Sequence, residues 1–468
     1  MATILGANTL SSGFDVANSV IFNSADSASM EKNAGTPTDN NKWTFSAWVK
    51  RSKLGSLQEI LYGDDGSTTN YCTIRFNDTS DTLTFKNRPG STTSTLTTNA
   101  VFRDVAAWYH LVVVLDTSNG TAANRDIIYI NGVRETSYST ESHSGDGDAC
   151  YINFDGDPIK ISKGRTGSFF DGYMSEVYFI DGQALAADSF GEFDSDSGIW
   201  KPIDASGLTF GNNGFYLDFE ASGNLGNDAN GGTDLTESNL AATDQSIDTC
   251  TNNFCTPNSL YPTGDITFSE GNLKTVSETY TQSPNGTLGA YAGKWYYEVK
   301  MTTTHGRFGW CESHCPQGDL DTSTTFPAYA VYSNGSNGLT VYKSVTAKAS
   351  TDNGGYTSFS DGDTLGIAFD IDNGKFYAHL NGTYYNSGDP PNGTGALMTG
   401  IAAQADGLFI PLITFGTDSS RTFEWNFGSP AHSISSGNAD GNGFGNFEYA
   451  PPSGFLAICS KNIASTGG

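Results

Sequence analysis

The stretch GDTLGIAFDIDNGKFYAHLNGTYYN (362–386) contains three short runs of strand-forming residues separated by two turn signals, Asp372-Asn373-Gly374 and Asn381-Gly382. An Asn-Gly pair between such runs predicts a type I′ hairpin turn, because both central positions need a positive φ. We therefore predict a three-stranded antiparallel meander. Alternation along its first run predicts one apolar face that contains Leu365, Ile367, Phe369 and Ile371.

A related hairpin signal occurs much earlier in the chain, in IIYINGVRE (127–135), with Asn131-Gly132 at the bend. Other runs also have an apolar period of two, and in KWTFSAWVK (42–50) one face holds Trp43, Phe45, Ala47 and Val49. WYHLVVVLD (108–116) is apolar on both faces, which is typical of a central strand, and only ALAADSFGEF (184–193) suggests a helical turn or two. Many short strands with turn residues between them predict an all-β fold with two tandem antiparallel β-sandwiches, or jelly rolls.

The strand signals fade between about residues 222 and 262, where the chain is rich in Gly and Asn and then gains prolines. We interpret the later part of this region as a linker between two domains. The predicted ranges are an N-terminal docking segment (1–40), a first sandwich (41–245), a Gly/Asn/Pro-rich linker (246–262), a second sandwich (263–430) and a C-terminal tail (431–468).

Two family resemblances rest on these strand motifs. WTFSAWVKR, WYHLVVVLD, IIYINGVRE and FDGYMSEVYFIDGQAL follow one another as in concanavalin A-like, laminin-G-type jelly rolls, over about residues 43–220. GKWYYEVKM followed by GDTLGIAFDIDNGKFYAHLNG resembles a SPRY domain, over about residues 290–430. The second motif set departs from the usual pattern at HGRFGWCESHCPQG (305–318), where two cysteines lie beside the expected Gly-rich strand.

Three further segments resemble virion structural proteins of marine bacteriophages: FIDGQALAADSFGEFDSDSGIWKPI, DQSIDTCTNNFCTPNSLYP and FEYAPPSGFLAICSKN. Both fold resemblances imply that loops at the sheet ends bind glycans or protein surfaces. The virion resemblance implies that such binding serves contact with a host cell. These are inferences by analogy, because a fold does not determine a function.

Charge and composition restrict the possible partners. The chain has 24 basic and 51 acidic residues, a net charge of −27, and lacks a basic stripe, so we expect no nucleic-acid binding. Its first residues lack the features of a signal peptide, and its longest apolar runs are too short to span a bilayer. Seven cysteines form an odd, scattered set that does not suggest a disulfide framework. We therefore expect synthesis in a host cytoplasm, release by lysis, location in a virion and no membrane insertion.

Asp218 and Glu220 are the candidate catalytic residues, because glycosidases use two carboxylates about 5–9 Å apart. Alternation would place both on one strand face, yet two solvated acids beside inward-facing Phe215, Leu217 and Phe219 explain the pattern as well. The usual third acid of such glycosidase motifs is missing. We find no nucleophile elbow, zinc-protease motif or phosphate-binding loop in the chain.

The candidate metal-binding and ligand-binding residues can each be explained equally well without a bound metal or ligand. Cys250, Cys255, Cys311, His314 and Cys315 could supply zinc ligands, but their spacings are unusual and buried thiols are the expected alternative. The acidic loops 144–150, 153–159 and 192–198 could offer calcium ligands, although turn formation explains their Asp and Gly content. Tyrosines at 332, 342 and 356 could stack on sugars or pack internally. The sequence therefore assigns no catalytic, cofactor-binding or metal-binding residue, and leaves the ligand-binding residues undetermined.

The function expected from the sequence is that of a non-enzymatic virion structural protein, such as a tail fibre or another surface appendage. Its sandwiches would bind host-surface glycans or proteins, while the N-terminal segment contacts other virion proteins, and we expect a homo-oligomer. One alternative is a capsid decoration protein with the same modules. Another is a glycan-cleaving enzyme that uses Asp218 and Glu220.

Overall fold

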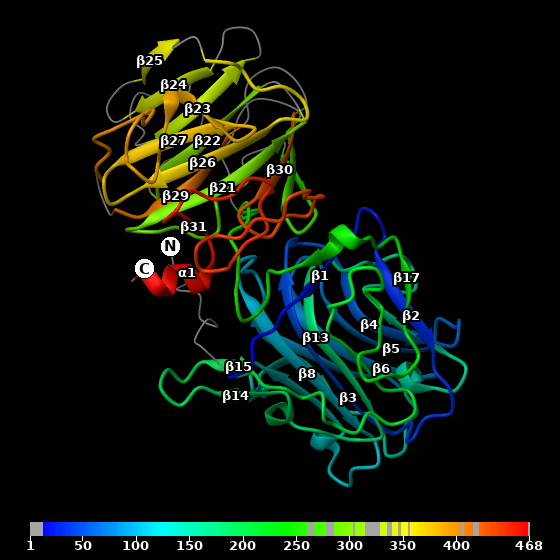
Figure 1. Ribbon diagram of the computed structural model, residues 1–468. Helices are drawn as coiled ribbons and strands as arrows, with labels where there is room; N and C mark the ends of the chain where they lie inside the picture. Colours follow the sequence, from blue (N-terminus) through cyan, green and yellow to red (C-terminus); the bar gives the residue numbers. More distant parts are fainter. Residues whose placement is uncertain are drawn as a thin grey trace. The chain divides into compact units, whose positions relative to one another are not determined.

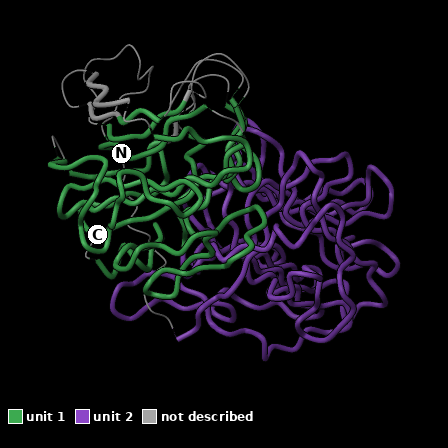
Figure 2. The backbone as a smooth tube through the Cα atoms, turned by 45° about the horizontal axis from the view of Figure 1, so that its top comes forward, with its two compact units in different colours: residues 1–5, 253–468 green, residues 6–252 purple. Residues whose placement is uncertain are grey.

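The computed structural model describes residues 13–260, 266–277, 285–302, 305–313, 328–334, 339–344, 348–353, 356–403, 407–414 and 421–466. The chain forms two compact units, a first module that ends at Asn252 and a second module that begins at Asn253 (Figure 2). Both consist of antiparallel sheets, so the predicted fold class of two tandem β-sandwiches is confirmed. The boundary between the units falls inside the 246–262 stretch that we expected to be a linker.

The first module contains two eight-stranded sheets (Figure 1). Sheet 1 has the order β10 (Val133–Arg134), β9 (Asp126–Ile130), β8 (Trp108–Asp116), β3 (Lys42–Arg51), β13 (Gly172–Asp181), β1 (Ser19–Phe22) and β18 (Gln245–Ser246), with β16 (Phe215–Leu217) beside β13. Sheet 2 has the order β11 (Tyr138–Ser142), β7 (Ser94–Val101), β6 (Thr82–Pro89), β5 (Asn70–Phe76), β4 (Gln58–Asp64), β12 (Pro158–Ile161), β2 (Ser29–Asn33) and β17 (Thr236–Ser238).

Shorter elements lie between these strands. A two-stranded ribbon is formed by β14 (Gly191–Phe193) and β15 (Trp200–Pro202). The 3-10 turns of the first module are η1 (Ala122–Asn124), η2 (Tyr151–Asn153), η3 (Ala187–Ser189) and η4 (Ala242–Asp244). The helical turn expected within 184–193 is therefore present only as η3, and the ribbon begins directly after it.

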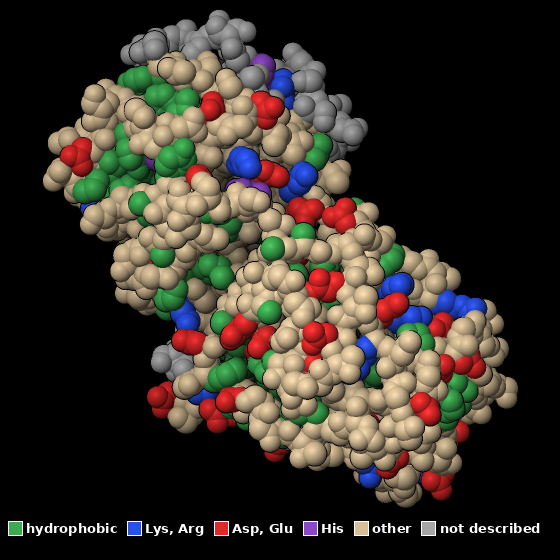
Figure 3. All heavy atoms as spheres, turned by 45° about the vertical axis from the view of Figure 1, so that its right-hand side comes forward, with side chains coloured by type: hydrophobic (Ala, Val, Ile, Leu, Met, Phe, Trp, Pro, Cys, Tyr) green, Lys and Arg blue, Asp and Glu red, His purple; other side chains and the backbone are tan. Residues whose placement is uncertain are grey.

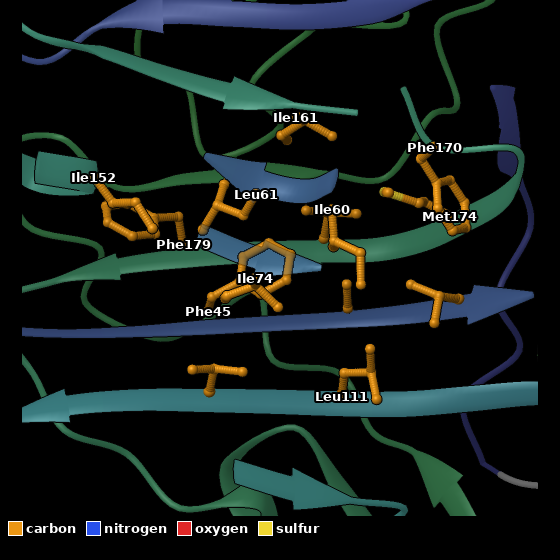
Figure 4. Close-up of a cluster of buried hydrophobic side chains, with 14 of the residues drawn as sticks. Phe45, Ile60, Leu61, Ile74, Leu111, Ile152, Ile161, Phe170, Met174 and Phe179 are labelled. Atoms are coloured by element: carbon orange, nitrogen blue, oxygen red, sulfur yellow. The ribbon is translucent and has the colours of Figure 1, made fainter. Parts of the chain in front are cut away.

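The core of the first module lies between sheet 1 and sheet 2. Phe45 and Leu111 from sheet 1 and Leu61 and Ile74 from sheet 2 belong to one buried cluster (Figure 4). The apolar face predicted for 42–50 is confirmed, since Trp43, Phe45, Ala47 and Val49 all join this cluster. At about 25 cal/mol per Å² of apolar surface removed from water, such burial is the main contribution to stability.

The opposite face of sheet 1 is buried as well. Irregular segments after β13 and before the module boundary cover it, so Thr44 donates its hydroxyl to the Gln183 carbonyl at 2.8 Å. Lys50 pairs with Asp248 at 2.7 Å, and both side chains are about 1% exposed. Separating the two residues would leave each charge buried without a counter-charge, which is strongly destabilising. The contact therefore holds the residues around 248 against the sheet.

The second module contains an eight-stranded sheet 3 and a five-stranded sheet 4. Sheet 3 has the order β19 (Ile266–Ser269), β20 (Lys274–Ser277), β30 (Arg421–Asn426), β21 (Lys294–Met301), β26 (Thr364–Asp370), β27 (Lys375–Leu380) and β28 (Thr383–Tyr384), with β31 (Leu456–Ala457) parallel to β21. Sheet 4 has the order β25 (Lys348–Asn353), β24 (Leu339–Ser344), β23 (Ala328–Asn334), β22 (His305–Glu312) and β29 (Phe409–Thr414). The 3-10 turn η5 (Tyr385–Ser387) and the helix α1 (Ser460–Thr466) complete the described elements.

The meander predicted from 362–386 is confirmed as β26, β27 and β28. Its second turn has φ values of 49° at Asn381 and 81° at Gly382, and the first module's turn has 48° at Asn131 and 79° at Gly132. Both pairs thus adopt the left-handed backbone that a type I′ turn requires. Aromatic side chains join the facing sheets, as in the 5.5 Å ring contact between Trp310 of β22 and Phe369 of β26.

Residues 431–466, expected as a tail beyond the second sandwich, pack against its sheet 3. Glu298 of β21 accepts hydrogen bonds from the backbone N–H groups of Glu448 and Tyr449, at 2.9 and 2.8 Å. The hydroxyl of Tyr296 donates to the same carboxylate at 2.8 Å, and the amide of Asn426 donates to it at 3.2 Å. The carboxylate therefore has several donors, although it is 1% exposed.

Two other ranges differ from the sequence prediction. Residues 19–33, expected within a separate docking segment, form β1 and β2 of the first module. The apolar run Val20-Ile21-Phe22 is fully buried, which explains why these residues join the sandwich. Within the expected linker, Asp248, Cys250 and Phe254 are buried, so this part of the chain also packs onto the modules. Residues 1–12 and 261–262 lie outside the described residues.

Candidate ligand-binding site

The outer face of sheet 2 carries a row of polar and aromatic side chains that the strand register brings together. Along β5, Cys72 and Ile74 enter the core, so Tyr71, Thr73 and Arg75 face outward. Tyr71 lies opposite Arg88 of β6, and Thr73 lies opposite Lys86.

Neighbouring strands extend this face. Tyr62 of β4 lies opposite Thr73 on one side and Lys160 of β12 on the other. A register shift between Glu59 and Leu61 lets both Ile60 and Leu61 enter the core while Tyr62 remains on the outer face. We call the group on this face the tyrosine patch: Tyr62, Tyr71, Lys86, Arg88 and Lys160.

The two tyrosine rings of the patch are stacked, with centroids 6.1 Å apart and planes 21° apart. The Lys160 ammonium lies 5.4 Å from the Tyr62 ring centroid, and the Lys86 ammonium lies 5.4 Å from that of Tyr71. The Arg88 guanidinium lies 5.9 Å from the Tyr71 ring. These distances are within the range of cation–π attraction, which holds the rings and the cations in one arrangement.

The cations of the tyrosine patch differ in how they are neutralised. Lys160 pairs with Asp64 at 2.9 Å, and Asp64 also accepts a 3.3 Å hydrogen bond from the Tyr62 hydroxyl. Lys86 and Arg88 form no ion pair with any carboxylate in the part of the chain that the structure describes. The Arg88 Nε–H is buried without a hydrogen-bond partner. Two positive charges therefore remain open for an external partner.

The pKa of the Tyr71 phenol is lowered by these cations. Burial would raise its pKa, but hydrogen bonds and charges from Lys86 and Arg88 outweigh burial and leave the pKa below the ordinary value of 10.0. A phenol O–H can donate one hydrogen bond, so the Tyr71 hydroxyl can serve as a donor to a ligand. Tyr71 is partly exposed, which makes that donor accessible.

Glu59 closes one end of this face. Its carboxylate accepts a hydrogen bond from the Thr73 hydroxyl and lies 3.9 Å from Arg75. Burial raises the pKa of Glu59 to about 7, partly opposed by Thr73 and Arg75. A side chain at Gly164 would place its Cβ 2.5 Å from the Glu59 Cγ, so the Gly164 backbone lies directly over this acid. Glu59 is therefore a covered acid rather than a group open to a ligand.

Tyr62 is only 4% exposed, so the partly exposed ring of Tyr71 and the charged donors beside it are the groups that can bind a sugar chain. Aromatic faces pack against the apolar C–H faces of sugar rings, and the donors can bond hydroxyl or acidic groups. Figure 3 shows that Lys and Arg side chains gather at a few places on a surface that is otherwise mostly uncharged or acidic. The tyrosine patch combines both requirements on one face of one sheet.

The candidate pair Asp218 and Glu220 does not form a carboxylate pair on one strand face. The strand β16 ends at Leu217, and the buried Phe219 has a φ of 59°. The Glu220 backbone N–H donates to the Asp218 Oδ1 at 3.0 Å, which closes a turn. Asp218 is half-buried and Glu220 is exposed, so the turn explains both acids without catalysis.

Sequence reasoning missed a buried carboxylate at Glu176. This residue lies at a register shift of β13 with a φ of 49°. The hydroxyls of Tyr178 and Tyr216 donate to it at 2.5 and 3.0 Å, and their rings stack with centroids 4.4 Å apart. Burial raises the pKa of Glu176 to about 7. An acid in the apolar run DGYMSEVYFIDG was the available signal, but the buried position shows no access for a substrate.

The proposed metal ligands are not brought together in the described residues. Cys250, Cys255 and Cys311 are buried, while His314 and Cys315 lie outside those residues. Within the ranges that the structure describes, no group of three or more His, Cys, Asp or Glu side chains could hold a metal ion.

The acidic loops mostly bind their own backbone. In 144–150, Asp148 accepts from the Gly145 N–H at 2.6 Å, and in 192–198, Asp194 accepts from the Ser197 N–H at 3.0 Å. In 153–159, Asp157 has one oxygen that is buried without a partner, and burial raises its pKa, with a further contribution from nearby Asp65 and Asp64. These contacts are those of turn-forming residues.

Tyr332 and Tyr356 make separate aromatic contacts in the described residues. The Arg307 guanidinium lies 4.7 Å from the Tyr332 ring, and Tyr356 makes a ring contact with Tyr385 at 5.5 Å. The Tyr342 side chain lies outside the described residues. Tyr62 and Tyr71 were not singled out in the sequence, because only the register of β4, β5 and β6 places them together.

Comparisons with known proteins agree with the two modules. Residues 22–189 match the concanavalin A-like lectin/glucanases superfamily, in its laminin-G-type form, and residues 294–430 match the SPRY domain. The chain thus carries a concanavalin A-like/laminin-G domain and a SPRY domain, as the sequence motifs indicated. The search of curated proteins found no match.

Solved structures with detectable similarity include the SPRY domain of human HERC1, at 13% identity, 33% coverage of this chain, 87% of that chain and a TM-score of 0.24. Domains LG4-5 of the mouse laminin alpha1 chain are 9% identical, with 96% and 89% coverage and a TM-score of 0.30. The SAP-like pentraxin from Limulus polyphemus is 14% identical, with 37% and 80% coverage and a TM-score of 0.28.

The described helices are also informative about membranes. None of the helices within the described ranges has both the length and the apolar character needed to cross a bilayer.

Proposed function

We propose that the protein is a non-enzymatic binding protein whose first module holds a glycan on the tyrosine patch. The observation that carries this proposal is the stacked pair Tyr62 and Tyr71, with two cations beside Tyr71 that lack a carboxylate partner. The match to a lectin-containing superfamily supports the same function.

Glycan binding can be tested by affinity electrophoresis and calorimetry with a panel of polysaccharides. Tyr71→Ala removes the partly exposed ring and should weaken binding by about five-fold or more, because truncating an aromatic anchor of a binding site costs more than about 1 kcal/mol. Tyr291→Ala is the matched control, because Tyr291 is a 48% exposed tyrosine of the second module. If Tyr71→Ala binds every polysaccharide as tightly as the unchanged protein, the tyrosine patch is not the glycan site.

In its narrower form, the proposal places this binding protein on a phage virion, as a tail fibre or another surface appendage. Support for this part comes from the sequence segments that resemble virion proteins of marine bacteriophages. Its partners would be neighbouring virion proteins, further copies of itself and a host-surface glycan or protein. Mass spectrometry of purified particles, followed by antibody labelling in electron microscopy, tests the location. Labelling of the capsid shell would favour the capsid decoration protein instead.

A further inference from the structure

We infer that the ligand of the tyrosine patch is an acidic polysaccharide, whose carboxylate or sulfate group binds between Lys86, Arg88 and the Tyr71 hydroxyl. This inference rests on the proposed function, since it assigns the chemical class of ligand to the same site. Lys86 and Arg88 are outward residues of one strand, separated by one inward residue. Their backbone positions therefore lie about 7 Å apart on one face.

The donors of this site converge because of the register. Arg88 lies directly opposite Tyr71, and Lys86 lies opposite the next outward residue, Thr73. The Lys86 ammonium and the Arg88 guanidinium lie 5.4 and 5.9 Å from the centroid of the Tyr71 ring. An anion placed beside that phenol would receive the Tyr71 O–H together with N–H groups of two cations. Hydrogen bonds of this charged kind are about twice as strong as neutral ones.

The net charge of the chain also favours an acidic ligand over a neutral one. The whole sequence carries a net charge of −27, so an unneutralised pair of cations on one face runs against its general composition. Asp64 is already paired with Lys160, and Glu59 is covered by the Gly164 backbone. A neutral sugar would leave Lys86 and Arg88 without a counter-charge, whereas an acidic sugar supplies one.

Screening allows an acidic polymer to approach an acidic protein. At physiological ionic strength the Debye length is about 8 Å, so the distant acids are largely screened while direct contacts at the patch persist. At 0.01 M salt the Debye length is about 30 Å, and repulsion from the whole surface should reach the polymer. Binding should therefore be strongest at intermediate salt and weaker at both extremes.

The test measures binding of the full-length protein to immobilised dextran, polygalacturonate, dextran sulfate and a single-stranded oligonucleotide. We expect retention by polygalacturonate or dextran sulfate and not by dextran, and the one retained identifies carboxylate or sulfate as the preferred anion. The double variant Lys86→Gln/Arg88→Gln should bind the acidic polymer at least ten-fold more weakly, whereas Lys86→Arg/Arg88→Lys should keep most of the affinity. Lys42→Gln is the control, because Lys42 lies on sheet 1 and pairs with Asp116 at 3.6 Å.

The outcomes separate this inference from the proposed function. Dextran binding that depends on Tyr71 but not on Lys86 and Arg88 would retain glycan binding and overturn the acidic ligand. A folded protein that binds none of the polysaccharides would overturn both. Oligonucleotide binding as tight as that of the acidic polysaccharides would also overturn the inference, because the site would then recognise polyanions in general. Melting curves of each variant check that the outward substitutions leave the fold intact.

Discussion

The two modules differ in what lies on the outer face of a central sheet. In the first module, part of the outer face of sheet 2 is open, and the tyrosine patch lies there with two cations that lack a carboxylate. In the second module, residues 431–466 pack on the outer face of sheet 3, where the carboxylate of Glu298 receives hydrogen bonds from the backbone N–H groups of Glu448 and Tyr449. The same sandwich architecture thus provides a candidate site where a face is left open and a structural anchor where a segment covers it.

A second contact network strengthens the covered face. The Gly382 N–H donates to the His379 Nδ1 at 3.1 Å, so the neutral ring carries its proton on Nε2 and donates it to the Tyr296 hydroxyl oxygen at 2.7 Å. Tyr296 in turn donates to Glu298. The chain of donors runs from a hairpin turn to the carboxylate that holds the C-terminal segment. Such networks are worth more than isolated hydrogen bonds, provided that every member is satisfied.

Of the changes considered, deletion of residues 431–468 should therefore have the largest effect on the difference in stability between the two modules. It removes the N–H donors of Glu298 together with the rings of Phe447 and Phe455, which pack edge-on against Tyr296 and Tyr377, so the second module should lose its cooperative melting transition. The first module should keep its transition and its polysaccharide binding. Differential scanning calorimetry measures both transitions in one experiment. Two unchanged transitions would show that the segment is an accessory tail rather than part of the fold.

The hairpin glycines provide a matched pair of substitutions. A Cβ at Gly132 would lie 2.2 Å from the Trp200 ring, and one at Gly382 would lie 2.8 Å from the Tyr449 ring. Both residues also have positive φ, so Gly132→Val and Gly382→Val should each cost on the order of 1–3 kcal/mol in unfolding free energy. Each variant should lower only the melting temperature of its own module. A shift of both transitions by either variant would contradict independent folding of the modules.

The buried titratable groups predict opposite pH dependence in the two modules. In the first module, burial raises the pKa of Glu59 and Glu176 to about 7 and lowers that of His110 to about 3. Between pH 4.5 and 6.5 the folded state holds two protons on the glutamates that the unfolded state releases. His110 has the opposite effect, because only the unfolded state protonates it in that range. Stability of the first module should therefore fall as pH rises, by about 1.4 kcal/mol per pH unit for one net proton.

In the second module, stability should change with pH in the opposite direction. Burial raises the pKa of Glu298 to about 7, but it lowers the pKa of both His379 and His432 to about 4. The stabilising contribution of the glutamate is present below pH 4.5 and is lost as pH rises through 7, whereas that of the histidines is present above 6.5 and is lost on acidification. Stability of the second module should therefore rise with pH between 4.5 and 6.5. Chemical denaturation of both modules across that range measures the two slopes, and slopes of equal sign would contradict the assignment.

The strands could largely be predicted from the sequence, and the site could not. Period-two patterns and the two Asn-Gly pairs are local signals, and they correctly indicated the meander and the face that contains Trp43 and Phe45. Coverage of the outer faces depends on irregular segments such as residues around 248 and 448, which have no period to detect. The tyrosine patch depends on the register of three strands, and the register cannot be read from the sequence of a single strand. Only the outward alternation of Tyr71 and Arg75 within NYCTIRF was available as a signal.

The smallest expected effect concerns Asp218 and Glu220, the acids that a glycan-cleaving enzyme would use. Asp218→Asn keeps the oxygen that accepts the Glu220 N–H, and Glu220→Gln alters an exposed side chain, so each should change the unfolding free energy by less than about 0.5 kcal/mol. Because neither residue belongs to the tyrosine patch, polysaccharide binding should also stay within two-fold of the unchanged protein. A reducing-end assay with the bound polysaccharide should detect no turnover before or after either substitution. Turnover by the unchanged protein that disappears in both variants would instead show that this turn is a catalytic site, and would replace the binding protein with an enzyme.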